Sequence, residues 1–448
     1  MNINDIKFLK IISRKISKFK NFCAKNYLKI FFTLIFLSIL TIATTFIIIF
    51  YCDIFFKFSN IAKDRILNRR ETVFLITPLF FWVSSYLYKK FAFNPYGTGL
   101  DNITFALKKL QKKPKNYFNV SNFIGIKIAL IIFISSLFST IGGGSLGREA
   151  PSIVIAVCIV FGLSYYFRKF LINLPLENWI YVGYAIGISV AFKAPFAGIF
   201  YVGEKLIKNK SKNYKISILF SLFALLIIYH LLINNCSVYV IKNFKNLVYR
   251  DLFHYLVIAL ICSLMALFLL SVSRYLFINF IKIKKIYWHF IPIFFGIVVA
   301  FCGLKYGVYS IGGGILSVNE ALISNVIIYD FDELIGRYFS TIFTYIAGNS
   351  GGLVAPSIAL GNLVGNVYGS IFENLDAKAL MLVGMVAFLS PVLSAPLTST
   401  IIILESIKID IANIYILAII SVISFSLVII FKKIGAKIRA KLFKPTTN

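Results

Sequence analysis

Long apolar runs recur along the whole chain, separated by short polar segments. Examples lie at residues 30–51, 217–234 and 255–273. Each reaches the roughly 20 residues that a helix needs to cross about 30 Å of hydrocarbon. This pattern predicts an all-α polytopic membrane protein. A secretory signal peptide is not expected, because the first run is too long and the lysine-rich segment before it is extended.

The chain also resembles itself. Three pairs of segments align in the same order, namely 97–107 with 312–322, 145–153 with 350–358, and 182–204 with 383–405. We therefore expect a membrane domain over residues 30–431 that consists of two related halves, about 30–215 and 250–431. An odd number of crossings in each half would make them inverted-topology repeats with tilted and broken helices.

Glycine-rich backbone followed by Ala-Pro marks places where a loop enters a helix. Such starts are Gly97-Thr98-Gly99, Gly147-Arg148-Glu149-Ala150 and Gly351-Gly352-Leu353-Val354-Ala355. The first amides of a helix lack internal partners and carry a partial positive charge. A buried helix start therefore favours an anion. Several starts must converge, because desolvating a small ion costs on the order of 20 kcal/mol in the idealised limit.

Arg148 and Glu149 stand next to each other inside sequence apolar enough for a membrane. Charges at such depth are costly and indicate function by default. An ionised Glu149 is expected to occupy the anion site itself and a protonated one to leave it, so it resembles a proton-operated gate. The alternatives are a purely structural ion pair for Arg148 and Glu149, and close-packing surfaces for the glycine segments.

The net charge of +30 lies at the ends of the apolar runs. Residues 1–29 and the tail 432–448 are strongly basic, as are the loops 108–115 and 205–215. Short basic segments beside apolar helices indicate the cytoplasmic side. We therefore expect both termini in the cytoplasm of a bacterial inner membrane, with the basic face also meeting anionic membrane lipids. No separate basic domain suggests nucleic-acid binding.

The cysteines and histidines provide no metal or cofactor motif. The six cysteines are scattered without a CxxC pair, and the three histidines are far apart and outside motifs such as HExxH. We expect no metal and no cofactor.

At its interrupted segments the sequence resembles the CLC family of chloride channels and proton-coupled chloride exchangers. "GREAP" (147–151) is similar to the family's G-[KR]-E-G-P element, and "GGLVAP" (351–356) to G-x-F-x-P. "GTGLD" (97–101) is similar to G-S-G-I-P, with Asp101 in place of the proline, and "FKAPFAG" (192–198) to F-N-A-P-L-A-G. The resemblance runs in order from about residue 30 to residue 431.

The resemblance implies a homodimer in which each subunit has its own pore for chloride or a similar small anion. It implies that Glu149 is the gating glutamate and that the backbone amides of Leu353 and Val354 bind the anion. Thr98 keeps the anion-facing hydroxyl, and the Gly147-Arg148 segment forms a further helix start at the site.

Two departures from the family pattern concern proton coupling. Proton-coupled members carry two adjacent acids after the Ala-Pro helix, whereas here the pair is Glu204-Lys205. This leaves three alternatives: Glu204 relays protons from a shifted place, Lys205 serves as an unusual relay, or coupling is weak or absent. A purely structural explanation is that the Lys205 side chain only reaches the cytoplasmic membrane surface. The family's inner tyrosine would fall near Ala436, where no tyrosine is present. Both changes favour looser coupling.

The resulting expectation is chloride transport that is channel-like or loosely coupled to protons. Its alternative is a tightly coupled proton–chloride antiporter. A polytopic membrane enzyme that uses Glu149 or Glu204 as acid or base lacks support, because no nucleophile–base pair or metal motif is present. A cation-coupled carrier of an organic anion would need more intramembrane carboxylates than Glu149, Glu204 and Glu405. The role of Lys193 stays open.

Overall fold

The computed structural model describes residues 27–91, 99–112, 120–209, 214–232, 237–242, 244–281, 287–324 and 331–442. These residues form helices, with no strand among them. Glu149, Arg148 and the other expected site residues lie within these ranges, with the exception of Thr98, which falls outside the described residues, as does most of the basic segment 1–29.

The helices follow one another in two series. The first comprises α2 (Tyr27–Asn68), α3 (Arg70–Phe91), α4 (Leu100–Lys112), α6 (Ile126–Ile141), α7 (Glu149–Tyr166), α8 (Leu176–Ala191), α9 (Pro195–Asn209) and α10 (Tyr214–Leu232). The second comprises α11 (Leu252–Ile281), α12 (Tyr287–Lys305), α13 (Ile315–Ile323), α14 (Phe331–Ile346), α15 (Val354–Ile371), α16 (Ala377–Leu393), α17 (Pro396–Ile407) and α18 (Ile414–Leu442). Within the described ranges, the 3₁₀ turn η1 (Tyr249–Asp251) leads into α11, η2 (Val308–Ser310) lies between α12 and α13, and η3 (Ile411–Asn413) lies between α17 and α18.

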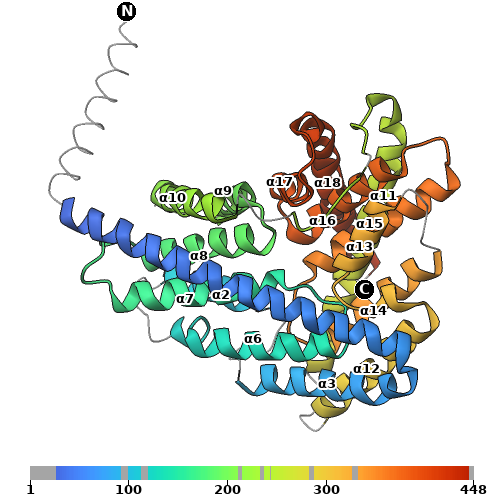
Figure 1. The fold of residues 1–448 in the computed structure, drawn as a ribbon, viewed down its shortest axis with the longest axis horizontal. Helices are drawn as coiled ribbons and strands as arrows, with labels where there is room; N and C mark the ends of the chain where they lie inside the picture. The colour runs from blue at the N-terminus through green and yellow to red at the C-terminus, as the bar shows by residue number, and fades with distance from the viewer. Residues whose placement is uncertain are drawn as a thin grey trace, which may run out of the picture.

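The apolar runs expected to span a membrane are helical, which confirms the all-α polytopic fold. Five helical segments of the described chain are long and apolar enough to cross a bilayer: Tyr27–Asn68, Glu149–Tyr166, Tyr249–Leu276, Trp288–Lys305 and Ile411–Gly435. Helix α2 has 42 residues, about twice the length needed to cross the hydrocarbon. It runs obliquely across the face of the molecule in Figure 1.

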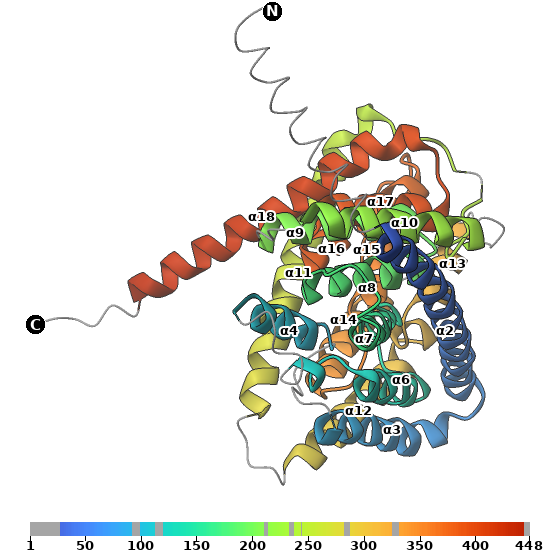
Figure 2. The same ribbon diagram turned by 90° about the vertical axis from the view of Figure 1, so that its left-hand side faces the viewer.

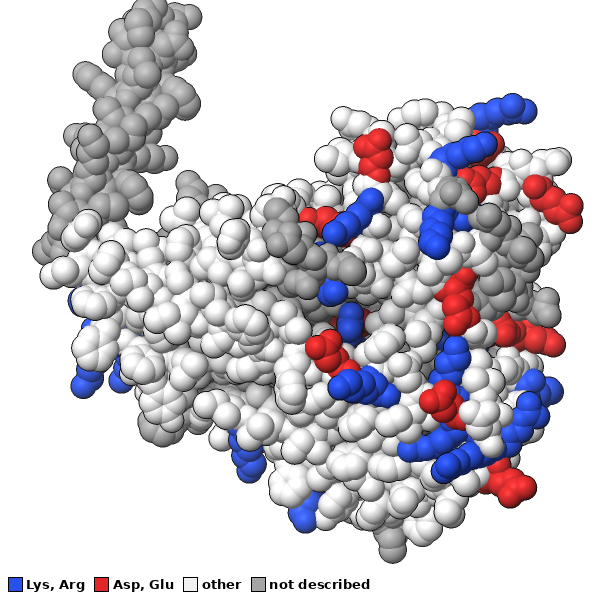
Figure 3. Space-filling model, in the orientation of Figure 1, with Lys and Arg blue, Asp and Glu red and all other residues white. Residues whose placement is uncertain are grey.

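Helix α7 lies at the centre of the protein. In its apolar window 78% of residues are buried, against 33–39% in the other four candidate spans. Figure 2 shows α7 surrounded by other helices, whereas α18 extends beyond the helical body toward its C-terminal end. The white surface over much of α2 in Figure 3 carries no charged side chain. A broad uncharged surface of this kind is suited to lipid, since a soluble monomer rarely exposes large apolar patches.

Aligned positions of the two series have the same backbone geometry. Gly99, before α4, has a φ of +84°, and Gly314, before α13, has a φ of +85°. Lys193 and Ser394 stand at aligned positions before the two Ala-Pro helices, and both are left-handed, with φ of +50° and +53°. Lys193 therefore belongs to a turn that recurs in the second half. The two halves therefore share the backbone geometry of these two turns.

Close helix packing brings the site-bearing helices together. Helix α7 packs on α8, and α15 packs on α16. A Cβ atom added at Gly183 of α8 would lie 2.6 Å from the Cα of Val157, and one added at Gly384 of α16 would overlap the carbonyl oxygen of Gly361. Small residues at such crossings let membrane helices approach at backbone distance. These contacts hold the starts of α7 and α15 inside the protein.

Candidate anion site at two opposed helix starts

The starts of α7 and α15 face each other and are joined through their backbones. The N–H of Gly147 donates to the carbonyl of Gly352 at 2.7 Å, and the N–H of Gly352 donates to the carbonyl of Gly147 at 2.9 Å. These two residues form an isolated antiparallel bridge, and they occupy aligned positions in the two halves. The structure thus brings together the two glycine segments that the sequence repeat singled out.

Both helix starts leave their first amides available. The N-cap residues, Arg148 of α7 and Leu353 of α15, make no side-chain capping hydrogen bond. Proline follows in the first turn of each helix, at Pro151 and Pro356, where its missing N–H has no partner to lose. The amides at the first positions of both helices therefore point to one region, which carries the positive ends of two helix dipoles.

The Glu149 carboxylate lies in this region. Its side chain is 2% exposed, and the backbone amides of Glu149 and Ala355 face its carboxylate. A Cβ atom added at Gly147 would overlap Oε2 of Glu149 and lie 2.8 Å from the Cβ of Ala355. The carboxylate therefore folds over Gly147 and occupies the junction between the two helix starts. Only glycine leaves room for it at position 147.

Leu353 and Val354 complete the buried part of the junction, with exposed fractions of 8% and 4%. Leu353 also lines a cavity of about 1060 Å³ that includes Asp101 at the start of α4 and Ser394 after α16. The start of α15 thus meets Glu149 on one side and an open cavity on the other. We call this cavity the α4 vestibule.

A second, small cavity of about 40 Å³ lies beside Arg148, which is half-buried. It is lined by the glycine loop 312–314 and by Arg337. Arg337 is 1% exposed and donates to the carbonyls of Gly312 at 3.1 Å and Ile311 at 2.9 Å, and also to that of Tyr309. Its guanidinium fixes the loop that leads into α13.

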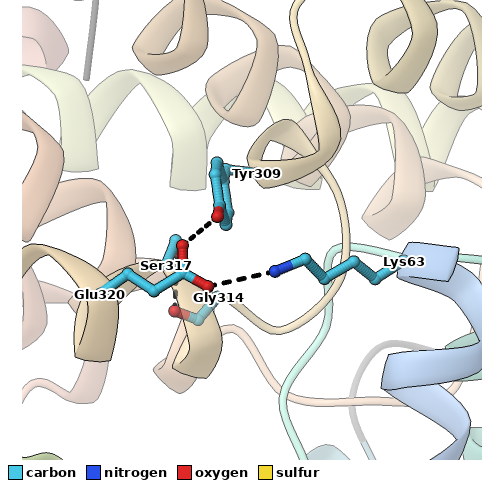
Figure 4. Close-up of polar contacts among 5 residues, drawn as sticks. All are labelled: Lys63, Tyr309, Gly314, Ser317 and Glu320. Atoms are coloured by element: carbon cyan, nitrogen blue, oxygen red, sulfur yellow. Dashed lines mark hydrogen bonds and ion pairs between the residues drawn. The ribbon is translucent and has the colours of Figure 1, made fainter. Parts of the chain in front are cut away.

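Figure 4 shows the polar contacts at the α13 edge of this small cavity. Lys63 of α2 donates to Oε1 of Glu320 at 3.1 Å, and the hydroxyl of Tyr309 donates to Oε2 of the same carboxylate. Ser317 donates to the carbonyl of Gly314 at 2.8 Å. Glu320 is thus held by a cation from the first half and a phenol from the second, which ties α13 to α2.

Three residues near Arg148 and Glu149 were not indicated as site residues by any pattern in the sequence. Tyr51 and Cys52 of α2 and Tyr239, from the segment between the halves, all lie near Arg148. Tyr51 also makes a 2.8 Å hydrogen bond with Ser136. Tyr51 and Cys52 lie within an apolar run, and Tyr239 lies outside any periodic segment, so neither pattern nor repeat marks them.

Glu204 lies apart from the junction and binds another helix start. Its Oε1 accepts from the backbone N–H of Leu397 at 2.9 Å, and its Oε2 accepts from the N–H of Thr398 at 3.1 Å and from the Thr398 hydroxyl. This geometry favours a capping role at the start of α17. Lys205 is part of α9, but its side chain lies outside the described residues. A proton-transfer role for either residue stays a prediction.

The C-terminal departure falls on a continuous helix. Residue Ala436, near which the family tyrosine was expected, is part of the uninterrupted α18. Among the described residues no group of three or more His, Cys, Asp and Glu side chains is placed to hold a metal ion.

Comparison with known proteins agrees with this geometry. The sequence model of the family described as "Voltage gated chloride channel" matches residues 79–428. The H(+)/Cl(-) exchange transporter ClcA of Klebsiella pneumoniae subsp. pneumoniae is 27% identical over 357 residues, which cover 74% of this chain and 70% of that protein. ClcA of Citrobacter koseri is 26% identical over 376 residues, covering 78% of this chain and 75% of that protein.

Two solved structures are similar in fold. A slow cyanobacterial Cl-/H+ antiporter has a TM-score of 0.73 at 19% identity, over 88% of this chain and 94% of that chain. A CLC-type fluoride/proton antiporter has a TM-score of 0.71 at 18% identity, with the same coverage. The family match spans most of the chain. The protein is thus a multi-pass membrane protein and not an enzyme, and it belongs to the CLC family of anion channels and transporters.

Proposed function

We propose that this protein exchanges chloride, or a similar small anion, for protons across a bacterial inner membrane. The observation that carries the proposal is the Glu149 carboxylate, which lies over Gly147 between the starts of α7 and α15. A carboxylate and a halide compete for the same backbone amides. The names of the ClcA relatives, which are exchange transporters, support exchange over a channel.

In this proposal, protonation moves Glu149 out of the junction. An ionised carboxylate is held by the facing amides and by the dipoles of two helices. A neutral carboxyl loses most of that attraction, so an anion displaces it. One helix end contributes only about 0.3–2 kcal/mol, against an idealised desolvation cost on the order of 20 kcal/mol. Two opposed starts, a third start at α4 and residual water are therefore needed together.

The proposed anion ligands come from three segments. They are the Thr98 hydroxyl, the Gly147-Arg148 start of α7, and the amides of Leu353 and Val354. The membrane domain of residues 30–431 would carry all of them, between basic segments 1–29 and 432–448. Both termini would face the cytoplasm, because short basic segments beside membrane helices tend to lie on the cytoplasmic side. We also propose a homodimer, to be checked by cross-linking in membranes.

Weak coupling is the second candidate. Lys205 replaces the second acid of the family pair, and Glu204 is engaged at the start of α17. The residue that accepts protons on the inner side is thus not given by the family pattern. A chain without such a residue would let anions slip without protons.

Flux in reconstituted vesicles tests the proposal. At saturating chloride, Glu149→Gln should abolish the pH dependence of chloride flux and leave the flux itself open. The exposed Glu373 provides a matched control, and Glu373→Gln should retain both flux and pH dependence. The gate reading is wrong if Glu149→Gln vesicles pass no more chloride at neutral pH than protein-free vesicles do.

The coupling itself is measured separately, as uphill proton movement driven by a chloride gradient. A fixed proton-to-chloride ratio supports the exchanger. Chloride flux without proton movement supports the weakly coupled candidate.

A further inference from the structure

The α4 vestibule is a charged entrance to the proposed anion path. Its lining includes the basic side chains Lys108, Arg274 and Lys432, together with one acid, Asp101. Leu353, at the start of α15, is also part of its lining. Lys432 comes from the C-terminal part of α18. An anion approaching Leu353 through this cavity passes these four charges.

Asp101 is set at the start of α4 by its backbone. It is in the first turn of the helix, two residues after Gly99, whose positive φ of +84° turns the chain into α4. The aligned position in the second half is Leu316, two residues after Gly314. The acid is therefore not required by the turn, because the same turn is made without it.

The Asp101 carboxylate is exposed and unengaged within the described part of the chain. The one ion pair found among the described side chains joins Lys63 and Glu320, and the Thr104 hydroxyl donates to the backbone carbonyl of Asp101 at 2.8 Å, not to its carboxylate. A carboxylate with no partner at hydrogen-bond distance acts on its surroundings through its charge.

The groups that face Asp101 come from every side of the vestibule. Arg274 of α11 and Lys108 of α4 attract its charge. Tyr345 of α14 lines the same cavity, and the buried phenols of Tyr88 in α3 and Tyr184 in α8 lie near Asp101 behind it. Lys432 of α18 shares the cavity. The phenols stay neutral near pH 7, so the charge of the vestibule changes at Asp101 when this face is acidified.

We propose that Asp101 is a proton-sensitive charge that sets the rate at which anions enter from the α4 vestibule. Ionised, it offsets one of the three cations and makes the vestibule less attractive to an anion. Protonated, it leaves the full positive lining, which concentrates anions in front of Leu353. The inference rests on the proposed function, and it adds a control by pH that is independent of Glu149.

The expected effect follows from Coulomb's law. One charge removed at about 8–10 Å in a wet cavity changes the local anion concentration roughly two- to threefold. Asp101→Asn should therefore raise the initial rate of chloride entry roughly two- to threefold at low chloride. The maximal rate at saturating chloride should not change, because the chemistry at the junction is untouched. Arg274→Gln should lower the initial rate by a similar factor.

The experiment compares initial chloride uptake by vesicles against chloride concentration, at low ionic strength and again with a high concentration of an impermeant salt. Asp332→Asn is the matched control, because Asp332 is also an exposed acid in the first turn of a helix, α14. In a Glu149→Gln background, acidification at low chloride should still speed uptake with Asp101 present and should have no effect with Asp101→Asn. Impermeant salt should remove the difference between variants.

The outcomes separate this inference from the proposed function. If Glu149→Gln vesicles transport chloride but Asp101→Asn behaves like Asp332→Asn, the role of Asp101 is refuted and the proposed function stands. If Asp101→Asn changes the maximal rate and is insensitive to impermeant salt, the residue acts through structure and the inference is also refuted. If neither the wild type nor Glu149→Gln passes chloride above protein-free vesicles, the proposed function itself fails.

Discussion

Glu204 and Glu405 cap each other's helices. Glu204 of α9 accepts from the first amides of α17, at Leu397 and Thr398. Glu405 of α17 accepts from the first amides of α9, with Phe196 N at 3.2 Å and Ala197 N at 3.1 Å. The two acids occupy aligned positions in the two halves. Each carboxylate therefore accepts hydrogen bonds from the first amides of the helix in the other half that is equivalent to its own helix.

Neutralising either cap should destabilise the protein. Hydrogen bonds to a charged group contribute about 1.5–3 kcal/mol, and an amide in place of the carboxylate retains part of this. We expect Glu204→Gln and Glu405→Gln each to reduce the free energy of unfolding by about 1–2 kcal/mol, seen as a lower midpoint in thermal unfolding in detergent. Glu373→Gln serves as control. A Glu204→Gln protein of normal stability with an altered proton-to-chloride ratio would instead identify Glu204 as a proton relay.

Gly147→Ala should displace the Glu149 side chain. The added Cβ overlaps Oε2 of Glu149 and approaches the Cβ of Ala355, so the carboxylate must leave the junction. We expect chloride flux with weakened pH dependence, as in Glu149→Gln. Gly203→Ala is the control, because a Cβ at Gly203 meets no atom within 4 Å. Unchanged pH dependence in a folded Gly147→Ala protein would show that the position of the carboxylate does not govern the gate.

Gly384→Ala should disturb the packing of α15 on α16. The added Cβ would overlap the carbonyl oxygen of Gly361 and lie 3.0 Å from its carbonyl carbon. Overpacking of a close crossing typically costs about 1–3 kcal/mol, which should appear as a lower unfolding temperature. Gly435→Ala, in open space on α18, should not lower the temperature, because alanine is the better helix former. Equal midpoints for both variants would argue against a backbone-distance contact at Gly384.

Arg337→Gln should loosen the glycine loop before α13. The guanidinium donates to the carbonyls of Gly312, Tyr309 and Ile311, and a shorter amide cannot reach all three. Unsatisfied buried groups cost about 1–3 kcal/mol each, so we expect a marked loss of thermal stability. Hydrogen exchange should be faster over residues 309–316 than over α15. Protection unchanged in that loop would contradict the assigned role.

Much of the fold follows from patterns visible in the sequence. Apolar runs predicted the helices, and the paired Gly and Ala-Pro segments predicted that two helix starts would be equivalent. The bridge between Gly147 and Gly352 is a tertiary contact, so the repeat could indicate the two partners but not their meeting. The alignment likewise paired Glu204 with Glu405 without indicating that their contacts cross between halves.

Other parts of the site have no local pattern. Tyr239 interacts with Arg148 and Glu149, yet it lies in a segment between the halves that has neither helical period nor repeat. The burial of Arg337 is possible because its guanidinium donates to three carbonyls of the loop before α13. The sequence of its own helix gives no sign of these partners. Asp101 was visible as a departure from the family motif, but its meaning depends on a cavity lined by α4, α11 and α18.

The pair of backbone hydrogen bonds between Gly147 and Gly352 has a consequence for how transport alternates between the two sides of the membrane. A rocking of one half against the other would have to break these two hydrogen bonds at the point where we propose that the ion is held. We expect the two halves to keep their relative position while side chains such as that of Glu149 change conformation. Spin labels placed at the far ends of α7 and α15 should accordingly report the same separation in acid and in base.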